Sequence, residues 1–76
     1  MSLPPESIQV GQCYLTSEGH VRRVLLILPS GVVQFEQRLA GLLRWARWRA
    51  QVADLRTFAA AIERQVPCDW TPETDG

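Results

Sequence analysis

Lysine is absent from this 76-residue chain, and all eight of its basic residues are arginines. Eight acidic residues balance them, so the formal net charge is zero. Arginine makes planar, bidentate contacts with carboxylate and phosphate groups and stacks on aromatic rings, whereas lysine is a mobile point charge. The neutral balance argues against a protein that coats nucleic acid, because such proteins carry a clear positive excess.

Metal ligands and thiols are scarce. The sequence has two cysteines, Cys13 and Cys68, and one histidine, His20. They lack the closely paired spacing of a metal site, so we expect no metal. We find no N-terminal secretory signal and no apolar run near the ~20 residues that a membrane helix needs. These absences predict a cytoplasmic protein in which both thiols are reduced and Cys13 is a small core residue.

Catalytic motifs are absent as well. The chain has no Gly-rich phosphate loop, no paired-carboxylate motif and no serine elbow. Cys13 and His20 are a conceivable nucleophile and base, but the hairpin predicted between them offers no third group to orient the histidine. We therefore expect neither enzymatic activity nor a cofactor.

What the chain does have is a run of three strand-like segments, at residues 11–16, 21–28 and 32–38, with short turns at 17–20 and 29–31. Short connections join strands in antiparallel order. The segments therefore predict a small curled antiparallel sheet of three to five strands. With one C-terminal helix packed on the sheet, the fold class is α+β.

The second and third strands differ in their hydrophobic pattern. After Arg23 the second strand is nearly all apolar, which predicts that both of its faces are covered and that it lies at the centre of the sheet. In the third strand Val33 and Phe35 are predicted to point inward. The residues predicted to point outward are Val32, Gln34, Glu36 and Arg38.

The remaining elements follow after residue 38. We expect a loop or helical turn over 39–47 and a short fourth strand over 48–52. Asp54 is a good N-cap for a helix, and Pro67 ends it. The apolar residues at helical spacing between them are Leu55, Phe58, Ala59, Ile62 and Val66.

The chain is predicted to be one small domain. Residues 1–9 are a loose leader, 10–67 form the sheet and helix, and 68–76 are an acidic tail. A domain of this size buries only about 60% of the surface of its unfolded chain. Its stability is therefore marginal, and self-association is a common remedy for so small a core.

Alternating arginine and tryptophan make residues 44–49 the strongest candidate binding site. Bases stack on aromatic rings while guanidinium groups meet phosphates, so the pattern suits single-stranded nucleic acid. The alternative is that one or both tryptophans fill the core and the arginines around them are solvated. Of the adjacent pair Arg22 and Arg23, only one can join any single patch, and one is expected to pair with Glu36. The candidate nucleic-acid or partner-binding residues are Arg38, Arg44, Trp45, Arg47, Trp48 and Arg49.

Trp70 is a candidate interface residue, because tryptophan is enriched at the energetic centres of protein interfaces. Simple packing within the chain is an equal alternative.

The chain resembles a group of short proteins of unknown function that prophages and integron gene cassettes encode. The resemblance covers roughly residues 11–66 and includes Val21-Arg22-Arg23-Val24, Val33-Gln34-Phe35-Glu36 and Leu55-Arg56-Thr57-Phe58-Ala59. It implies an SH3-like barrel with a C-terminal helix, carried by a mobile element. Plasmid-borne type II dihydrofolate reductases share that barrel and have a Val-Gln-Ile-Tyr pore motif, but Glu36 stands where their essential tyrosine would be.

Three hypotheses for function follow. The first is a non-enzymatic binding module that acts through protein–protein contact as a homodimer. The second is nucleic-acid binding through residues 44–49. The third is small-molecule binding in a pocket between sheet and helix or between subunits. Residues proposed to line that pocket are Cys13, Tyr14, Phe35 and Trp45.

Overall fold

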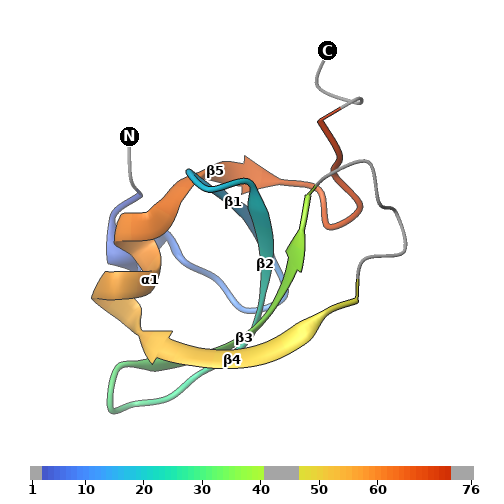
Figure 1. Cartoon of the computed structure of the whole chain (residues 1–76). Helices are drawn as coiled ribbons and strands as arrows, with labels where there is room; N and C mark the ends of the chain where they lie inside the picture. The colour runs from blue at the N-terminus through green and yellow to red at the C-terminus, as the bar shows by residue number, and fades with distance from the viewer. Residues whose placement is uncertain (1–2, 41–46, 73–76) are drawn as a thin grey trace.

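The computed structural model describes residues 3–40 and 47–72. Within these ranges the chain forms a five-stranded antiparallel sheet and one α-helix, so the predicted α+β class is confirmed. The strand order is β4-β3-β2-β1-β5, so the curled sheet is open, with β4 and β5 at its edges (Figure 1). The elements are the 3₁₀ turn η1 (Pro5–Ser7), β1 (Cys13–Thr16), β2 (His20–Ile27), β3 (Val32–Leu39), β4 (Arg49–Asp54), α1 (Leu55–Ala61) and β5 (Ile62–Val66).

The three predicted strands and their two turns are present as β1, β2 and β3, with ends that differ by at most two residues. Strand β2 lies in the middle of the sheet, as predicted. Gly19 and Gly31 have φ angles of 85° and 91°. Glycine adopts this left-handed region at little cost, which is why it stands in both turns.

The prediction that both faces of β2 are covered is wrong at its C-terminal end. The register with β3 shifts between Val24 and Leu26, so Leu25 is an extra residue at a β-bulge. Beyond this bulge, the alternation of inward-facing and outward-facing side chains along β2 is reversed. Val24 is buried opposite Phe35, but Leu25 and Leu26 are 43% and 44% exposed.

The predicted fourth strand is confirmed as β4, and Asp54 is the helix N-cap, since its side chain accepts a hydrogen bond from the Arg56 amide. The predicted end of the helix is wrong. Helix α1 ends at Ala61, and the chain continues as strand β5 rather than as helix to Pro67. The helix is therefore not C-terminal.

Strand β5 forms because β1 offers it a partner along its whole length. Ile62 pairs with Thr16 and Val66 pairs with Cys13, and a register shift between Leu15 and Thr16 leaves Glu63 of β5 as an extra residue. The two apolar residues are buried in different clusters, Ile62 inside the curled sheet and Val66 on its outer side. Ile62 and Val66 are four residues apart, a spacing typical of one face of a helix, but here both belong to a strand with an irregular register.

The main core lies inside the curl, between the sheet, α1 and the N-terminal segment. The ring of Tyr14 meets that of Phe58, and Phe58 meets Phe35, both edge to face. Ile8 is 5% exposed, and the Tyr14 hydroxyl accepts a hydrogen bond from the Gln9 amide. Part of the segment expected to be a loose leader is therefore packed in the core.

A second, smaller core covers the outer face of the sheet. It contains Leu15, Val21 and Val66, with Trp48 and Trp70 packed against it. The residues after β5 reach this face beside the end of β3 (Figure 1). The part of the predicted tail next to Pro67 is thus packed as well.

A disulfide between Cys13 and Cys68 lies in the second core. The prediction that both thiols are reduced is therefore wrong. Cys13 is 1% exposed, as expected of a core residue. The bond forms because Val66 pairs with Cys13, which leaves Cys68 two residues beyond the end of β5.

Candidate functional site

The predicted arginine and tryptophan residues do not form one surface. Arg44 and Trp45 lie outside the described residues. Of the others, Arg47 and Arg49 are exposed, Trp48 is half-buried and Arg38 is buried. The structure therefore separates residues with structural contacts from residues that face solvent.

Arg38 is a structural residue. Its side chain lies on the outer face of β3, as predicted, but the second core covers that face and leaves Arg38 only 7% exposed. Its Nη2 donates hydrogen bonds of 2.8 Å to the carbonyl oxygens of Cys68 and Trp70. Burial lowers the pKa of its guanidinium, and nearby Asp69 opposes that effect. Arg38 thus fixes the segment after β5 to the sheet.

Trp48 makes cation–π contacts with two arginines. The guanidinium carbons of Arg23 and Arg38 lie 4.5 Å and 5.2 Å from the centre of a Trp48 ring. Arg23 also forms a salt bridge with Glu36, which confirms the expected pairing across β2 and β3. A base that stacked on Trp48 would have to compete with these contacts.

Trp70 packs within the chain. It lies against the second core, and the guanidinium carbon of Arg64 is 5.5 Å from the centre of its ring. Its buried indole N–H has no hydrogen-bond partner among the described residues. Of the two alternatives, packing within the chain is therefore observed.

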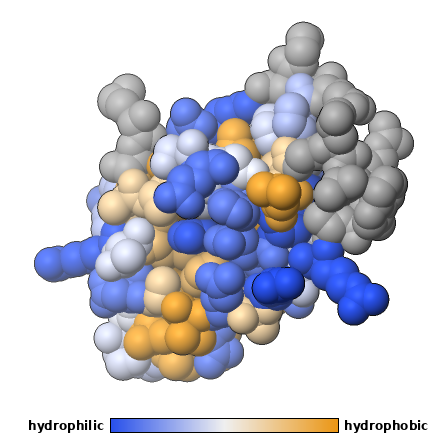
Figure 2. All heavy atoms as spheres, viewed as in Figure 1, coloured by the Kyte–Doolittle hydropathy of each residue, from blue (hydrophilic) through white to orange (hydrophobic). Residues whose placement is uncertain are grey.

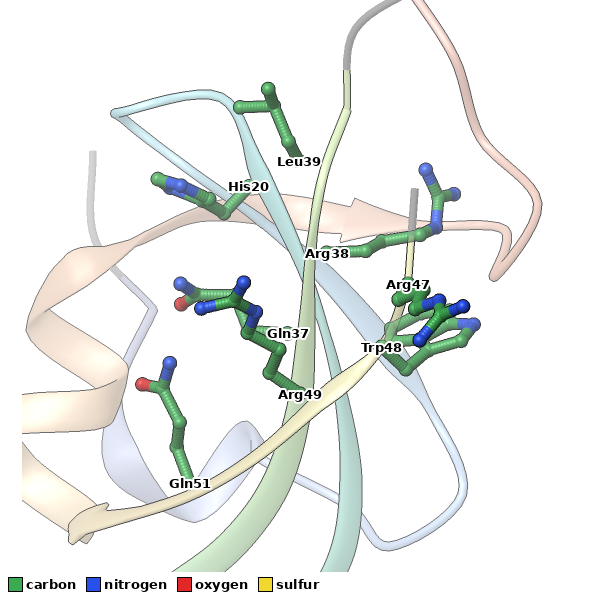
Figure 3. A pocket seen from close by; sticks show the side chains of 8 residues that line it. All are labelled: His20, Gln37, Arg38, Leu39, Arg47, Trp48, Arg49 and Gln51. Carbon is green, nitrogen blue, oxygen red and sulfur yellow. The ribbon is translucent and has the colours of Figure 1, made fainter. Parts of the chain in front are cut away.

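A groove lies at one end of the sheet, where β2 begins, β3 ends and β4 begins. Its volume is about 730 Å³. In Figure 3, Gln37, Arg49 and His20 lie on one side of β3 and Arg38 on the other, so the groove passes around this end of the sheet. The residues that line it are His20, Gln37, Arg38, Leu39, Arg47, Trp48, Arg49 and Gln51.

The strand register places the polar residues of the groove. Arg22 on β2 is opposite Gln37 on β3, and Gln37 is opposite Arg49 on β4. Directly opposed residues of antiparallel strands have side chains on the same face. This row continues from the buried Tyr14 of β1, which shows that it belongs to the inner face of the curl.

Arg22 lies beside the groove and supports it. Its guanidinium carbon is 4.8 Å and 5.4 Å from the ring centres of Phe35 and Phe58, and its Nε donates a 2.7 Å hydrogen bond to Oε1 of Gln37. Burial lowers the pKa of Arg22, and Glu18 partly offsets that effect. The only salt bridge in the described ranges joins Arg23 and Glu36, so no carboxylate there pairs with Arg22.

The groove is electropositive. The described residues that line it include Arg38, Arg47 and Arg49 but no aspartate or glutamate. Figure 2 shows that the side of the molecule seen in Figure 1 is mostly hydrophilic across its middle, with hydrophobic atoms gathered at the lower left, near the turn between β2 and β3, and a smaller group at the upper right.

Sequence reasoning missed His20, Gln37, Gln51 and the role of Arg22. The inward alternation from Val33 and Phe35 continues to Gln37, and that pattern was available in the sequence. The positions of Arg22 and Gln51 depend on strand pairing, which the sequence does not give.

A second exposed surface is the edge strand β4. It pairs only with β3 among the described strands. Val52, at its centre, is 66% exposed. Val52 is opposite Gln34, and Gln34 is opposite Leu26, so these three form an exposed row on the outer face.

The conceivable dyad of Cys13 and His20 is not available in this structure. Cys13 is bonded to Cys68, which removes the thiol of the conceivable dyad with His20. Within residues 3–40 and 47–72 there is no group of three or more metal-ligating side chains. No helix in the same ranges is long and apolar enough to cross a membrane.

No family model, curated protein or solved structure matches this chain.

Proposed function

We propose that this chain is a non-enzymatic binding module that acts through protein–protein contact, and that it forms a homodimer through β4. The observation that supports this most directly is the outer edge of β4, which pairs with no other strand in residues 3–40 and 47–72. Edge strands expose unpaired backbone N–H and C=O groups and can add a strand from another chain. Natural proteins protect such edges with charges, proline or bulges.

The composition of β4 favours pairing. Its charged residues, Arg49 and Asp54, stand at the two ends, and the four residues between them are Ala50, Gln51, Val52 and Ala53. The centre of the strand therefore has none of the usual protection. A second copy of β4 is a well-matched partner for this edge.

A two-fold axis at Val52 gives a consistent register. The two β4 strands would run antiparallel, with Val52 opposite Val52 of the second copy on the outer face. The exposed row of Leu26, Gln34 and Val52 would then continue into the same row of the second copy. Pairing of the two valines removes apolar surface from water, which favours association.

A charge at the centre of the strand tests the homodimer. We expect wild type to be dimeric at high micromolar concentration and Val52→Lys to be monomeric, as measured by light scattering coupled to size exclusion. Two lysines opposite each other would repel, and the apolar contact between the two valines would be lost. Because Val52 is 66% exposed, the substitution leaves the fold intact.

Val10→Lys is the matched control, since Val10 is 54% exposed and lies outside the sheet. It should remain dimeric. A wild type that stays monomeric at high micromolar concentration contradicts the homodimer, and a dimeric Val52→Lys variant contradicts the β4 interface.

Nucleic-acid binding through residues 44–49 has less support from the described residues. Of the predicted contacts, Arg38 is held by two carbonyl groups and Trp48 is stacked against two guanidinium groups. Arg47 and Arg49 remain exposed. If the hypothesis is right, Trp48→Ala and Arg47→Ala weaken oligonucleotide binding, and affinity falls steeply with salt.

The remaining expectations also stay proposals. An SH3-like relationship and a mobile-element origin rest on the resemblance in sequence alone. The cytoplasmic location is predicted from the lack of a secretory signal and of a membrane-length apolar run, and the Cys13–Cys68 disulfide does not favour it. Disulfides form and persist mainly in oxidising compartments.

A further inference from the structure

The groove at the ends of β2, β3 and β4 presents hydrogen-bond donors. Arg49 contributes a guanidinium group, which can only donate, on the side of β3 where Gln37 also lies (Figure 3). The amide of Gln37 can in principle donate or accept. Because its Oε1 already accepts from Arg22 Nε at 2.7 Å, its Nε2 is the atom left for the groove. The hydrogen bond from Arg22 therefore leaves the Gln37 amide as a hydrogen-bond donor toward the groove.

Arg22 also contributes positive charge that the described part of the protein does not neutralise by direct pairing. It is held between Gln37 and the rings of Phe35 and Phe58. Its burial penalises the charged form, as the lowered pKa of its guanidinium reflects, and Glu18 offsets only part of that penalty. A bound anion nearby would offset that penalty, since opposite charge stabilises a buried cation.

The size of the groove suits a small molecule. Ligand pockets of proteins range over roughly 300–1,000 Å³. The groove volume of about 730 Å³ is within this range and exceeds what a bare inorganic anion fills. His20, Leu39 and Gln51 line the remainder and provide contacts for an organic part of a ligand.

We propose that this groove binds the phosphate group of a small phosphorylated molecule, with Arg49 and Gln37 as its donors and Arg22 as a positioning residue. Guanidinium groups bind phosphate oxygens with short, charge-assisted hydrogen bonds, and a phosphate accepts more of them than a carboxylate does. The site is separate from the outer β4 row, so it does not depend on the proposed homodimer.

The decisive variant is Gln37→Glu. A glutamate keeps an oxygen to accept from Arg22 but places negative charge where the proposed donor stands. We expect adenosine monophosphate to bind wild type in isothermal titration calorimetry at low salt. In Gln37→Glu the affinity should fall at least about tenfold, since a charge-assisted donor is replaced by a repelling group. The melting temperature should be unchanged or higher, because Arg22 gains a charged partner.

Gln34→Glu is the matched control, since it makes the same change on the outer face of the same strand. Its affinity should stay within about twofold of wild type, as is typical for a surface charge away from the site. Arg49→Gln should weaken binding and Arg56→Gln, on helix α1, should not.

Three results would overturn the proposal. One is no heat of binding with millimolar adenosine monophosphate or inorganic phosphate at low salt. Another is equal loss of affinity in Gln34→Glu and Gln37→Glu, which would mean unspecific attraction by the net charge. The third is tighter binding of a thymidine oligonucleotide than of adenosine monophosphate, which would assign the groove to a nucleic-acid strand.

Discussion

Arg38 joins two parts of the chain that are 30 residues or more apart in sequence. A buried cation is stable only when hydrogen bonds replace its hydration. Here the carbonyl groups of Cys68 and Trp70 provide that replacement, and Trp48 lies against the guanidinium. A residue that the sequence presented as a ligand-binding cation is used to close the second core.

Truncation of Arg38 should therefore reduce stability. We expect Arg38→Ala to lower the free energy of unfolding by roughly 2–4 kcal/mol, because it removes two charge-assisted hydrogen bonds and leaves a cavity. Urea denaturation followed by circular dichroism measures the change. Arg47→Ala, at an exposed arginine, should shift stability by no more than about 0.5 kcal/mol. Equal stability of the two variants would contradict the structural role of Arg38.

At the scale of elements, the junction between α1 and β5 shows how tertiary pairing limits a helix. Ala61 is the last helical residue, and its carbonyl accepts a hydrogen bond from the Ser17 amide. Ile62 is already extended, with ψ at 132°, and pairs with Thr16. The sheet edge therefore satisfies backbone groups that a longer helix would otherwise have paired internally.

A helix of seven residues depends strongly on its cap. The Asp54 carboxylate accepts from the Arg56 amide at 3.1 Å. We expect Asp54→Ala to lower the free energy of unfolding by about 1 kcal/mol, and Asp54→Asn to retain most of the stability, since asparagine also caps helices. Chemical denaturation of the three proteins makes the comparison. The same loss in both variants would show that charge, not capping, is what matters at this position.

At the scale of the whole molecule, the disulfide is the main covalent constraint on a small domain. Cys13 and Cys68 are 55 residues apart, so the bond links β1 to the segment after β5. Closing a loop of this length restricts the unfolded chain substantially. The bond also holds Trp70 near Arg38, which completes the outer core.

Reduction should destabilise the protein markedly. For a loop of this length the chain-entropy relation gives about 4 kcal/mol, a large part of the stability of a domain of this size. We expect the melting temperature to fall when a phosphine reductant is added, as followed by circular dichroism. A Cys13→Ser/Cys68→Ser variant should melt at the lower temperature with or without reductant. Identical melting of oxidised and reduced wild type would contradict a stabilising bond.

The sequence by itself determined the hairpin strands, the central place of β2, the inward Val33 and Phe35, and the Asp54 cap. Each of these depends on a local pattern: alternation with a period of two, a glycine in a turn, or a capping side chain before an apolar run. Such patterns act over a few residues, so they can be interpreted before the chain is folded.

Only the tertiary structure decided the features that join distant residues. The burial of Arg38, the Cys13–Cys68 bond and the conversion of residues 62–66 into a strand all follow from the pairing of β5 with β1. The row of Arg22, Gln37 and Arg49 follows likewise from the register of three strands. Register is set by the packing of the whole sheet, because a shift of one residue moves every side chain to the other face.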